Sequence, residues 1–473
     1  MGARAAGRGH APVPSGRALR PVATAADSTA ALGSRSIGRL LWHTCSQTTL
    51  SVGVYGIYAL TNAWFVARGV GPDAMAAVNL AAPVLLVLGA VSATVGAGGA
   101  SLVSRSLGAG DTAVAARAAG NAFTLFWLTA ATITIAGLAT LDPLITALGA
   151  EAGARDDTRA YTAILLCGAL VSTGFSSLVR AEGRMRYATM LWLIPVLVQI
   201  TLDPLLIFVF DLGVRGAALG TVGGQAVSAL MGLWFFFGRR HRPYRITARD
   251  LRPHRPTIAA LLGVGAPSFL AGFGATLLAV LVNNILAGAA GTVALAAYAV
   301  CSRIQTFVMM PQLGISQGLQ PIVGFNAGRG LPGRVARART VALRATIGYG
   351  VTAAAVLIAF AGPLVAVFVD DPAIAPAAEH ALRILAVGIA AAGVTPLVSA
   401  YFQSLGRTAP SYLLSVGSLL LIKAPLVIVV SRTGLAGIWT SLAAGDITCA
   451  VVALLLLRLD RSIPRPHPYR SSF

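Results

Sequence analysis

The chain has 473 residues, of which 56% are hydrophobic and only 11% are charged, and its mean hydropathy is +0.77. Because a soluble domain usually carries about 25% charged residues, this composition excludes an ordinary soluble globular protein and indicates a membrane protein with many helices. The net charge of +20 does not point to a nucleic-acid partner, since the arginines lie in short loops and tails rather than on one continuous basic face.

The chain begins with a basic stretch, residues 1–36, that is rich in Arg, Ala, Gly and Ser. This composition predicts a disordered tail. The tail lacks an apolar segment, so we do not expect a secretory signal. A mitochondrial-type transit peptide is the alternative interpretation, since the tail has many arginines and few acids.

Twelve apolar stretches follow the tail, and each exceeds the roughly 20 residues that a helix needs to cross the hydrocarbon layer. The expected helices cover residues 38–66, 74–104, 113–140, 158–181, 186–210, 214–238, 257–287, 292–322, 338–362, 376–404, 409–431 and 434–457. The sequence therefore predicts an all-α polytopic membrane protein with about 12 transmembrane helices.

The placement of the arginines predicts the orientation in the membrane, because cytoplasmic loops carry an excess of Arg and Lys. The basic loops all follow even-numbered helices and comprise residues 104–117, 180–186, 238–255 and 328–339, together with Arg407 and the segment 458–470. Two of the loops between them carry acids instead, including Asp142, Glu151 and Glu379. We therefore expect a multi-pass protein of the plasma (inner) membrane with both termini in the cytoplasm.

The longest and most basic loop divides six predicted helices from six. We expect a first lobe at residues 37–240, a cytoplasmic linker at 241–256, a second lobe at 257–458 and a cytoplasmic tail at 459–473.

The two halves also resemble each other in sequence. "GPDAMAAVNLAAP" (71–83) aligns with "GTVALAAYAVCSR" (291–303), and "GAGDTAVAARA" (108–118) aligns with "GRGLPGRVARA" (328–338), both at a shift of 220 residues. One constant shift favours duplication, although chance matching of Ala and Gly is the alternative. Six helices per half give both halves the same orientation, which predicts two pseudo-symmetric six-helix bundles that rock about a substrate cavity.

The apolar run "VQITLDPLLIFVF" (198–210) contains one carboxylate, Asp203, near its middle. A charge there costs at least a few kcal/mol, so it is usually functional or neutralised. Pro195 and Pro204 lie in the same predicted helix and tend to kink it. A freed carbonyl beside a carboxylate favours uptake of a small cation. The alternative is a buried carboxylate that only joins two helices by hydrogen bonds.

The second half places three charges near the middles of its predicted helices, namely Arg303, Lys423 and Asp446. Lone charges in lipid are costly, so we expect a salt-bridged cluster that joins Asp446 to Lys423 or to Arg303. In the alternative interpretation, Lys423 extends its ammonium group outward to the membrane surface.

Several uncharged residues are candidates for a substrate cavity. Asn283 and Asn284 fall in the seventh predicted helix beside the expected interface between the lobes, where they would contact substrate or join helices. Gln317 would line the cavity or pack the end of the eighth helix. Met309 would contribute a soft, adaptable surface for drugs, or face lipid or core like most such residues.

The segment "PQLGISQGLQPIVGFNAG" (311–328) resembles a conserved run of the MATE (multidrug and toxic compound extrusion) transporter family. "RAEG" (180–183), "LDPLLIFVFDLGVRGAALGT" (202–221), "FQSLGR" (402–407) and "GIWTSLAAGD" (437–446) resemble further segments of that family. The similarity covers nearly all of residues 38–458. It implies a secondary active multidrug exporter that exchanges amphipathic or cationic organic compounds for H⁺ or Na⁺.

Within this resemblance, Asp203 matches an aspartate of the first lobe that takes part in ion coupling, and Thr221 matches a threonine near it. Asn62 stands where many relatives have aspartate, and Gln199 where they often have asparagine. One carboxylate with amide and hydroxyl neighbours holds a dehydrated Na⁺ less well than a pair, yet burial favours its protonated form. We therefore expect proton coupling, with sodium as the alternative.

Motifs for other chemistries are absent from the sequence. It contains no Walker-type loop, no His/Glu metal motif and no G-x-S-x-G elbow, so we expect neither an enzyme nor a cofactor beyond the coupling ion. A lipid-linked precursor flippase is the alternative function, and a strongly cationic cavity would favour it. The expected partners are small organic substrates and the lipid bilayer, and we expect the chain to act as a monomer.

Overall fold

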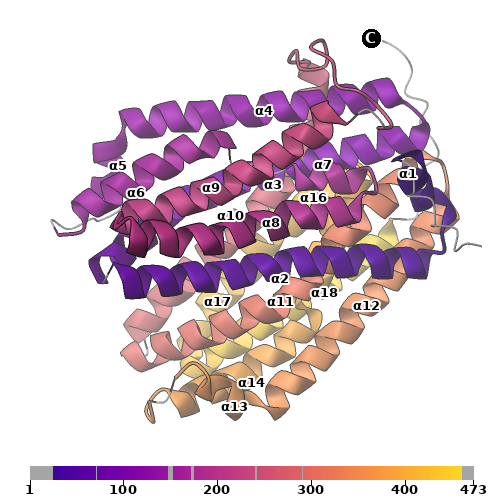
Figure 1. Ribbon diagram of the computed structural model, residues 1–473. Coiled ribbons are helices and arrows are strands. Elements are labelled where there is room, and N and C mark those ends of the chain that lie inside the picture. Colours follow the sequence, from indigo (N-terminus) through magenta and orange to yellow (C-terminus); the bar gives the residue numbers. More distant parts are fainter. Residues whose placement is uncertain are drawn as a thin grey trace, which may run out of the picture.

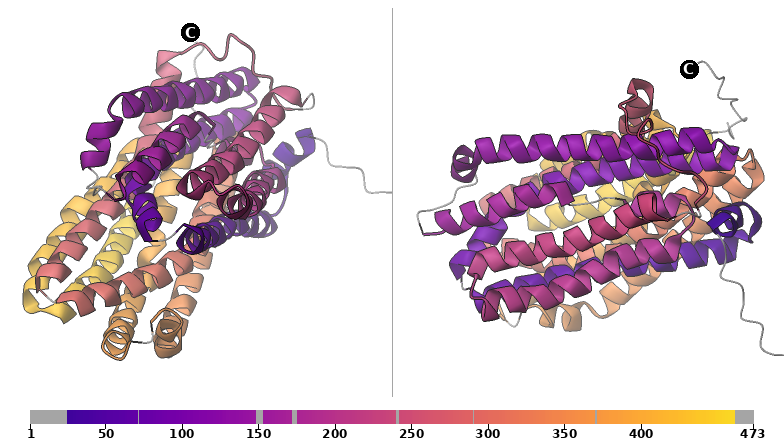
Figure 2. Two further views of the ribbon diagram at one scale, coloured as in Figure 1. Left: turned by 60° about the vertical axis from the view of Figure 1, so that its left-hand side comes forward. Right: turned by 45° about the horizontal axis from the view of Figure 1, so that its top comes forward.

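The computed structural model describes residues 25–70, 72–147, 153–171, 175–239, 242–289, 291–369 and 371–460. The described residues form helices joined by short turns and contain no strand. Figure 1 shows the long helices side by side and running in roughly one direction, and both views of Figure 2 agree.

The helices of the first lobe follow the predicted order closely. They are α2 (Ile37–Gly69), α3 (Pro72–Ala109), α4 (Thr112–Ala139), α5 (Leu141–Ala147), α6 (Arg155–Gly168), α7 (Ser176–Ala181), α8 (Met185–Pro204) and α9 (Gly213–Leu233). A 3-10 turn, η1 (Ala169–Val171), follows α6, and π-helical turns, η2 (Leu205–Val209) and η3 (Trp234–Gly238), extend α8 and α9.

The second lobe repeats this plan. Its helices are α10 (Arg255–Ala289), α11 (Gly291–Gly328), α12 (Pro332–Ala359), α13 (Ala361–Ala366), α14 (Ala375–Ala392), α15 (Val394–Ser404), α16 (Thr408–Tyr412), α17 (Ala424–Val430) and α18 (Leu435–Leu459). The long π segment η4 (Leu413–Lys423) joins α16 to α17, and the 3-10 turn η5 (Ser431–Thr433) precedes α18. In Figure 1 the first lobe lies mainly above α2 and the second mainly below it.

The lengths of these helices confirm the predicted fold class. Among the described residues, eleven helical segments are long and apolar enough to cross a membrane, and α2, with 33 residues, runs beside them. Short apolar helices such as α5 and α13 continue the long ones at 220-residue spacing. The expectation of about twelve spans in two six-helix bundles therefore agrees with the structure.

The predicted disorder of residues 1–36 was wrong for their last part, because residues Ala25–Ser34 form the helix α1. Residues 1–24 lie outside the described part. Leu32 of α1 is buried, and the Thr29 hydroxyl donates to the Glu182 carbonyl at 2.7 Å. In the second lobe, the Asn326 amide donates to the Leu32 carbonyl at 3.0 Å. Contacts with both lobes stabilise a helix that the composition of the tail does not predict.

The linker between the lobes packs against the first lobe. The Asn121 side chain of α4 donates to the Asp250 and Arg252 carbonyls and accepts from the His254 amide. Arg242 forms an ion pair with Glu182, and both side chains are buried. The linker is thus an ordered part of the end of the molecule that carries the arginine-rich loops, which we call the basic end.

Contacts between α3 and α11 reveal the relation between the lobes. A Cβ on Gly108 would overlap with the Phe325 carbonyl, and a Cβ on Gly328 would overlap with the Arg105 carbonyl. Gly108 and Gly328 are 220 residues apart, and so are Arg105 and Phe325. A pair of contacts that exchange partners in this way is the arrangement that a two-fold axis produces, and it supports the predicted duplication.

The lobes share a core only at the basic end. One hydrophobic cluster there combines residues of both lobes, such as Val103 and Ala119 with Leu319 and Val398. Toward the opposite end the clusters separate, because one contains only residues of the second lobe and two contain only residues of the first. The lobes are therefore joined at the basic end and packed independently at the other.

The surfaces that the lobes turn toward each other are exposed at that opposite end. Val87 on α3 and Phe307 on α11 follow the helix faces that make contact between the lobes further down, yet both are exposed to solvent. We call the space between these faces the cleft. It opens away from the basic end.

Candidate functional site

Asp203 lies in the last turn of α8, where the regular helix changes into the π turn η2. Pro204 follows it directly and has no amide hydrogen, so the carbonyl of Ile200 loses its usual helical partner. Local sequence therefore explains why the backbone is irregular here. Irregular backbone inside a membrane helix is tolerated where protein or water satisfies the freed groups.

The Asp203 side chain is buried against the backbone of α9. It is only 1% exposed, and its Oδ1 atom has no hydrogen-bond partner. A Cβ added to Gly220 of α9 would occupy the position of that Oδ1 atom. Glycine at position 220 therefore makes the room for the carboxyl group.

Gln199 and Thr221 lie beside Asp203 and join the same two helices. Gln199 Nε2 donates to Thr221 Oγ1 at 2.9 Å, and Thr221 Oγ1 donates to the Ala217 carbonyl at 3.1 Å. Gln199 precedes Asp203 by one helical turn, so the two side chains share a face. The predicted neighbours of Asp203 on α8 and α9 are thus brought together.

Asn62 comes from α2, which runs parallel to α8. Thr189 on α8 donates to the Gln47 carbonyl at 3.1 Å, and Gly69 contacts Ile207 at the other end. These offsets are 189 − 47 = 142 and 207 − 69 = 138 residues, which place Asn62 level with residues 200–204. The Asn62 Oδ1 atom is buried and has no hydrogen-bond partner. Asn62 therefore lies at the depth of Asp203.

This arrangement is a buried carboxyl group surrounded by amides, a hydroxyl and backbone. Among the described residues, Asp203 takes part in no salt bridge, and no cluster of three or more His, Cys, Asp or Glu side chains is present. An unpaired buried carboxylate is costly, so the group is stable when it carries a proton or holds a cation. Asp203 faces neighbouring helices and is not fixed by an arginine.

Comparison with known proteins identifies the architecture around this site. The MatE family model matches residues 49–205 and 267–429, well over half of the chain. The chain belongs to the MATE family. It is accordingly a multidrug efflux transporter with membrane-spanning helices.

Relatives with known names match this MATE transporter over most of their length. "Multidrug export protein MepA" of Staphylococcus haemolyticus is 25% identical, with 85% of this chain and 89% of the relative covered. The same protein of Staphylococcus aureus strain N315 is 27% identical, with 88% and 91% covered. A solved structure described as the outward-facing conformation of a multidrug resistance MATE family transporter has a TM-score of 0.85 and 26% identity, with 91% and 97% covered.

Replacing Gly220 by alanine is expected to lower gradient-driven export at least about tenfold. The new methyl group would displace the Asp203 carboxyl, and overpacking of this kind costs about 1–3 kcal/mol, where about 1.4 kcal/mol corresponds to tenfold. Gly223→Ala is the matched control, because only the movable end of the Leu202 side chain approaches that position. Initial export rates in everted vesicles check this result, and equal rates for the two variants would contradict it.

Sequence reasoning missed the glycines that form one wall of this site. Gly216, Gly220 and Gly224 are spaced by four residues on α9 and meet, in turn, the Leu206 carbonyl, Asp203 and Gln199. Small residues spaced by four are a known signal of close helix approach in membranes. The signal was therefore present in the sequence.

In the second lobe of this MATE transporter, Lys423 and Asp446 form the expected ion pair. Lys423 Nζ lies 2.6 Å from Asp446 Oδ1, and the two side chains are 29% and 20% exposed. They line a cavity of about 130 Å³, together with Tyr298, Gln305 and Ser441 among others. Arg303, the other proposed partner of Asp446, is exposed and makes no such contact. The pairing thus excludes outward extension of Lys423 in this state.

Removing either member of this pair is expected to destabilise the second lobe. A fully buried pair costs about 3–5 kcal/mol when broken, and partial exposure here reduces the expected loss to about 1–2 kcal/mol. The single variants Lys423→Ala and Asp446→Ala should both melt earlier in detergent. The exchanged double variant, Lys423→Asp with Asp446→Lys, should recover part of the loss, and no recovery would count against the pairing.

The remaining candidate residues separate by direction. Asn283 is exposed and follows Gly265, which contacts α3, by five complete helical turns, so it faces the cleft; Asn284 points about 100° away. Gln317 is half-buried in the part of α11 where the lobes already touch. Met310, not Met309, contacts α2 at Gly56. Of these four residues, the structure directs only Asn283 into the cleft.

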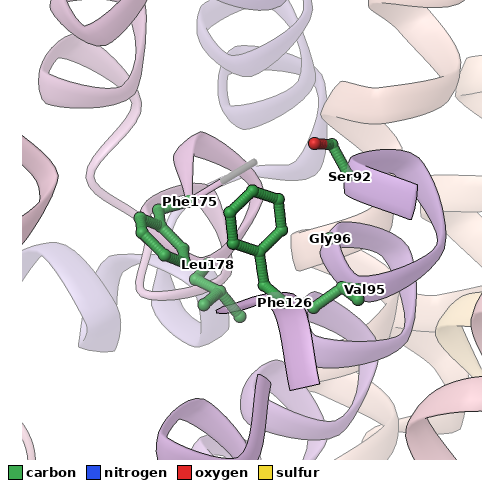
Figure 3. Close-up of a pocket in the computed structure, with 6 residues that line it drawn as sticks. All are labelled: Ser92, Val95, Gly96, Phe126, Phe175 and Leu178. Atoms are coloured by element: carbon green, nitrogen blue, oxygen red, sulfur yellow. The ribbon is translucent and has the colours of Figure 1, made fainter. Parts of the chain in front are cut away.

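A small apolar pocket between α3, α4 and α7 offers no further site. Figure 3 shows the rings of Phe126 and Phe175 beside Leu178 and the helix that carries Ser92 and Val95. Its volume of about 10 Å³ leaves room for at most one water molecule. The pocket is a packing gap in the shared core.

Proposed function

We propose that this MATE transporter exports amphipathic organic compounds, cationic ones included, in exchange for protons, and that Asp203 takes up the proton. The observation that carries the proposal is a buried carboxyl group without a cationic partner, held where α2, α8 and α9 meet. Sodium is the alternative coupling ion. A single carboxylate offers it fewer charges than a pair.

The proposed orientation places the basic end in the cytoplasm of a bacterial plasma membrane, because arginine-rich loops remain on that side. The cleft then opens to the outside, and the structure represents an outward-open state. The two-fold relation of the lobes supports a rocking exchange between two such states.

In the proposed cycle, a proton reaches Asp203 while the cleft is open to the outside. Neutralising the carboxyl group removes the charge that the π turn and Thr221 surround, and the first lobe repacks. Substrate then leaves, the lobes rock, and the proton is released on the cytoplasmic side. Only a group that changes charge between the two states can transmit the ion gradient in this way.

The cleft favours this function over a lipid-linked precursor flippase. A flippase of this architecture needs a strongly cationic cavity for phosphate groups. The described cleft faces are apolar at Pro83, Leu86 and Val87, and Arg303 is the cation identified on them. This composition suits amphipathic molecules with a large apolar part.

Reconstitution of the full chain in liposomes tests the proposal. We expect an imposed pH gradient to drive movement of a fluorescent amphipathic cation, and a sodium gradient without a pH gradient to drive none. Movement under the sodium gradient alone would assign sodium as the coupling ion. No movement under either gradient, with counterflow of the dye also absent, would contradict export of such compounds.

A further inference from the structure

Arg303 lies deep along α11 and is exposed. It follows the start of that helix by twelve residues, which is about 18 Å of helix at 1.5 Å per residue. A charged side chain at such a depth is costly in hydrocarbon, so it faces water or a partner. The direction of Arg303 therefore decides its role.

The helix face that carries Arg303 is the face that α11 turns toward the first lobe. Arg303 precedes Met310 by seven residues and Gly314 by eleven, spacings that return to the same side of an α-helix. Met310 lies against Gly56 of α2, and Gly314 lies against Thr49. Arg303 is the next position along this face toward the open end, so its guanidinium group projects into the cleft.

The acids of the second lobe leave this arginine uncompensated. Asp446 is bonded to Lys423, and Glu379 is bonded to Arg383. Within the residues that the structure describes, no carboxylate lies within salt-bridge distance of Arg303. The opposite face of α3 is apolar at Leu86 and Val87. The cleft thus presents one unpaired guanidinium group among apolar surfaces.

A guanidinium group in a partly dehydrated space binds planar anions through two parallel hydrogen bonds, and carboxylates fit this fork best. Phe307 lies one turn deeper on the same face and is exposed, so it offers an aromatic surface beside the charge. We propose that Arg303 and Phe307 form a recognition site for the acidic group of a substrate, so that the transporter prefers amphipathic compounds that carry a carboxylate. This inference rests on the proposed export function and specifies one end of its substrate.

A pair of dyes that differ only in the acidic group tests the site directly. Tetramethylrhodamine is zwitterionic, and its methyl ester lacks the carboxylate. Binding of both to the purified full chain in nanodiscs is measured by fluorescence anisotropy. We expect the wild type to bind the free acid more tightly than the ester, and Arg303→Gln to lose about tenfold in affinity for the acid alone, as expected for one charge-assisted bidentate contact.

The control variants separate this site from general effects of charge or folding. Arg432→Gln removes an exposed arginine in η5 and should change neither affinity. Arg303→Lys keeps the charge without the fork and should fall between the wild type and Arg303→Gln, which tests the site even if the glutamine variant does not fold. An equal loss for acid and ester, or no loss for either, would overturn the proposal.

Two further outcomes distinguish the origin of a failure. If the wild type binds the ester and transports it, but binds the acid no better, the export function stands and the acidic-group site fails. If the wild type binds neither dye, the proposed function fails and the site with it. Short-chain phosphatidylglycerol as competitor addresses lipid phosphate, and displacement of the acid by this lipid at lower concentrations than by unlabelled acid would assign the site to lipid and overturn the proposal.

Discussion

Replacing Asp203 by asparagine is expected to reduce gradient-driven export to the level of empty liposomes while dye counterflow without a gradient continues. Asparagine has the shape of aspartate and fits above Gly220, yet it can neither bind nor release a proton near neutral pH. The lobes can therefore still exchange, but the ion gradient no longer biases the exchange. Paired measurements of driven transport and counterflow on the same preparation check this result.

The matched control for this experiment is Asp211→Asn. Asp211 is exposed at the end of η2 and has φ of 52°, a left-handed conformation that asparagine adopts readily. The same chemical change only eight residues away should leave driven transport intact. Driven transport that survives in Asp203→Asn would instead support the alternative in which Asp203 only joins helices.

Replacing Gly108 by alanine is expected to separate the lobes at the basic end. Its new methyl group would overlap with the Phe325 carbonyl, which belongs to the backbone of α11 and cannot rotate away. Overpacking of this kind costs about 1–3 kcal/mol, which corresponds to a shift of about 5- to 150-fold between two states. The state that is closed at the basic end should lose population by this factor.

Cys45 provides a native reporter of that separation. Its Sγ atom lies 3.8 Å from the Ile315 carbonyl between the lobes, while Cys301 and Cys449 are buried and the exposed Cys167 can be replaced by serine. Maleimide labelling of Cys45 should accelerate in Gly108→Ala. Gly89→Ala, also on α3 but with nothing within 4 Å of the new methyl group, should label at the wild-type rate. Equal labelling in both variants would show that the Gly108 contact does not hold the lobes together.

The sequence predicted the positions of the helices well, because length and hydrophobicity act along the chain. The expected helix at 113–140 is α4 at Thr112–Ala139, and the expected helix at 434–457 is α18 at Leu435–Leu459. The 220-residue shift likewise relates Gly108 to Gly328, which hold equivalent contacts. Burial of Asp203 followed from its place in an apolar run.

Predictions that depended on helix faces were less complete. Asp446 had two proposed partners, and only the packing of η4 against α18 brings Lys423 to it. Arg303 faces the cleft instead, and Met310 rather than Met309 meets α2. The helix α1 was not predicted, because its stability comes from Glu182, Asn326 and other residues far away in the sequence.

The sequence by itself determined that this protein is a bundle of membrane helices in two related halves with one acid in the interior of the first. Those properties follow from composition and local spacing, since water and lipid act on each segment directly. Only the tertiary structure decided that Asp203 rests on Gly220, that the lobes meet at the basic end alone, and that Arg303 points between them. The depth and face at which two distant helices meet depend on backbone approach at a few glycines, and no single segment contains that information.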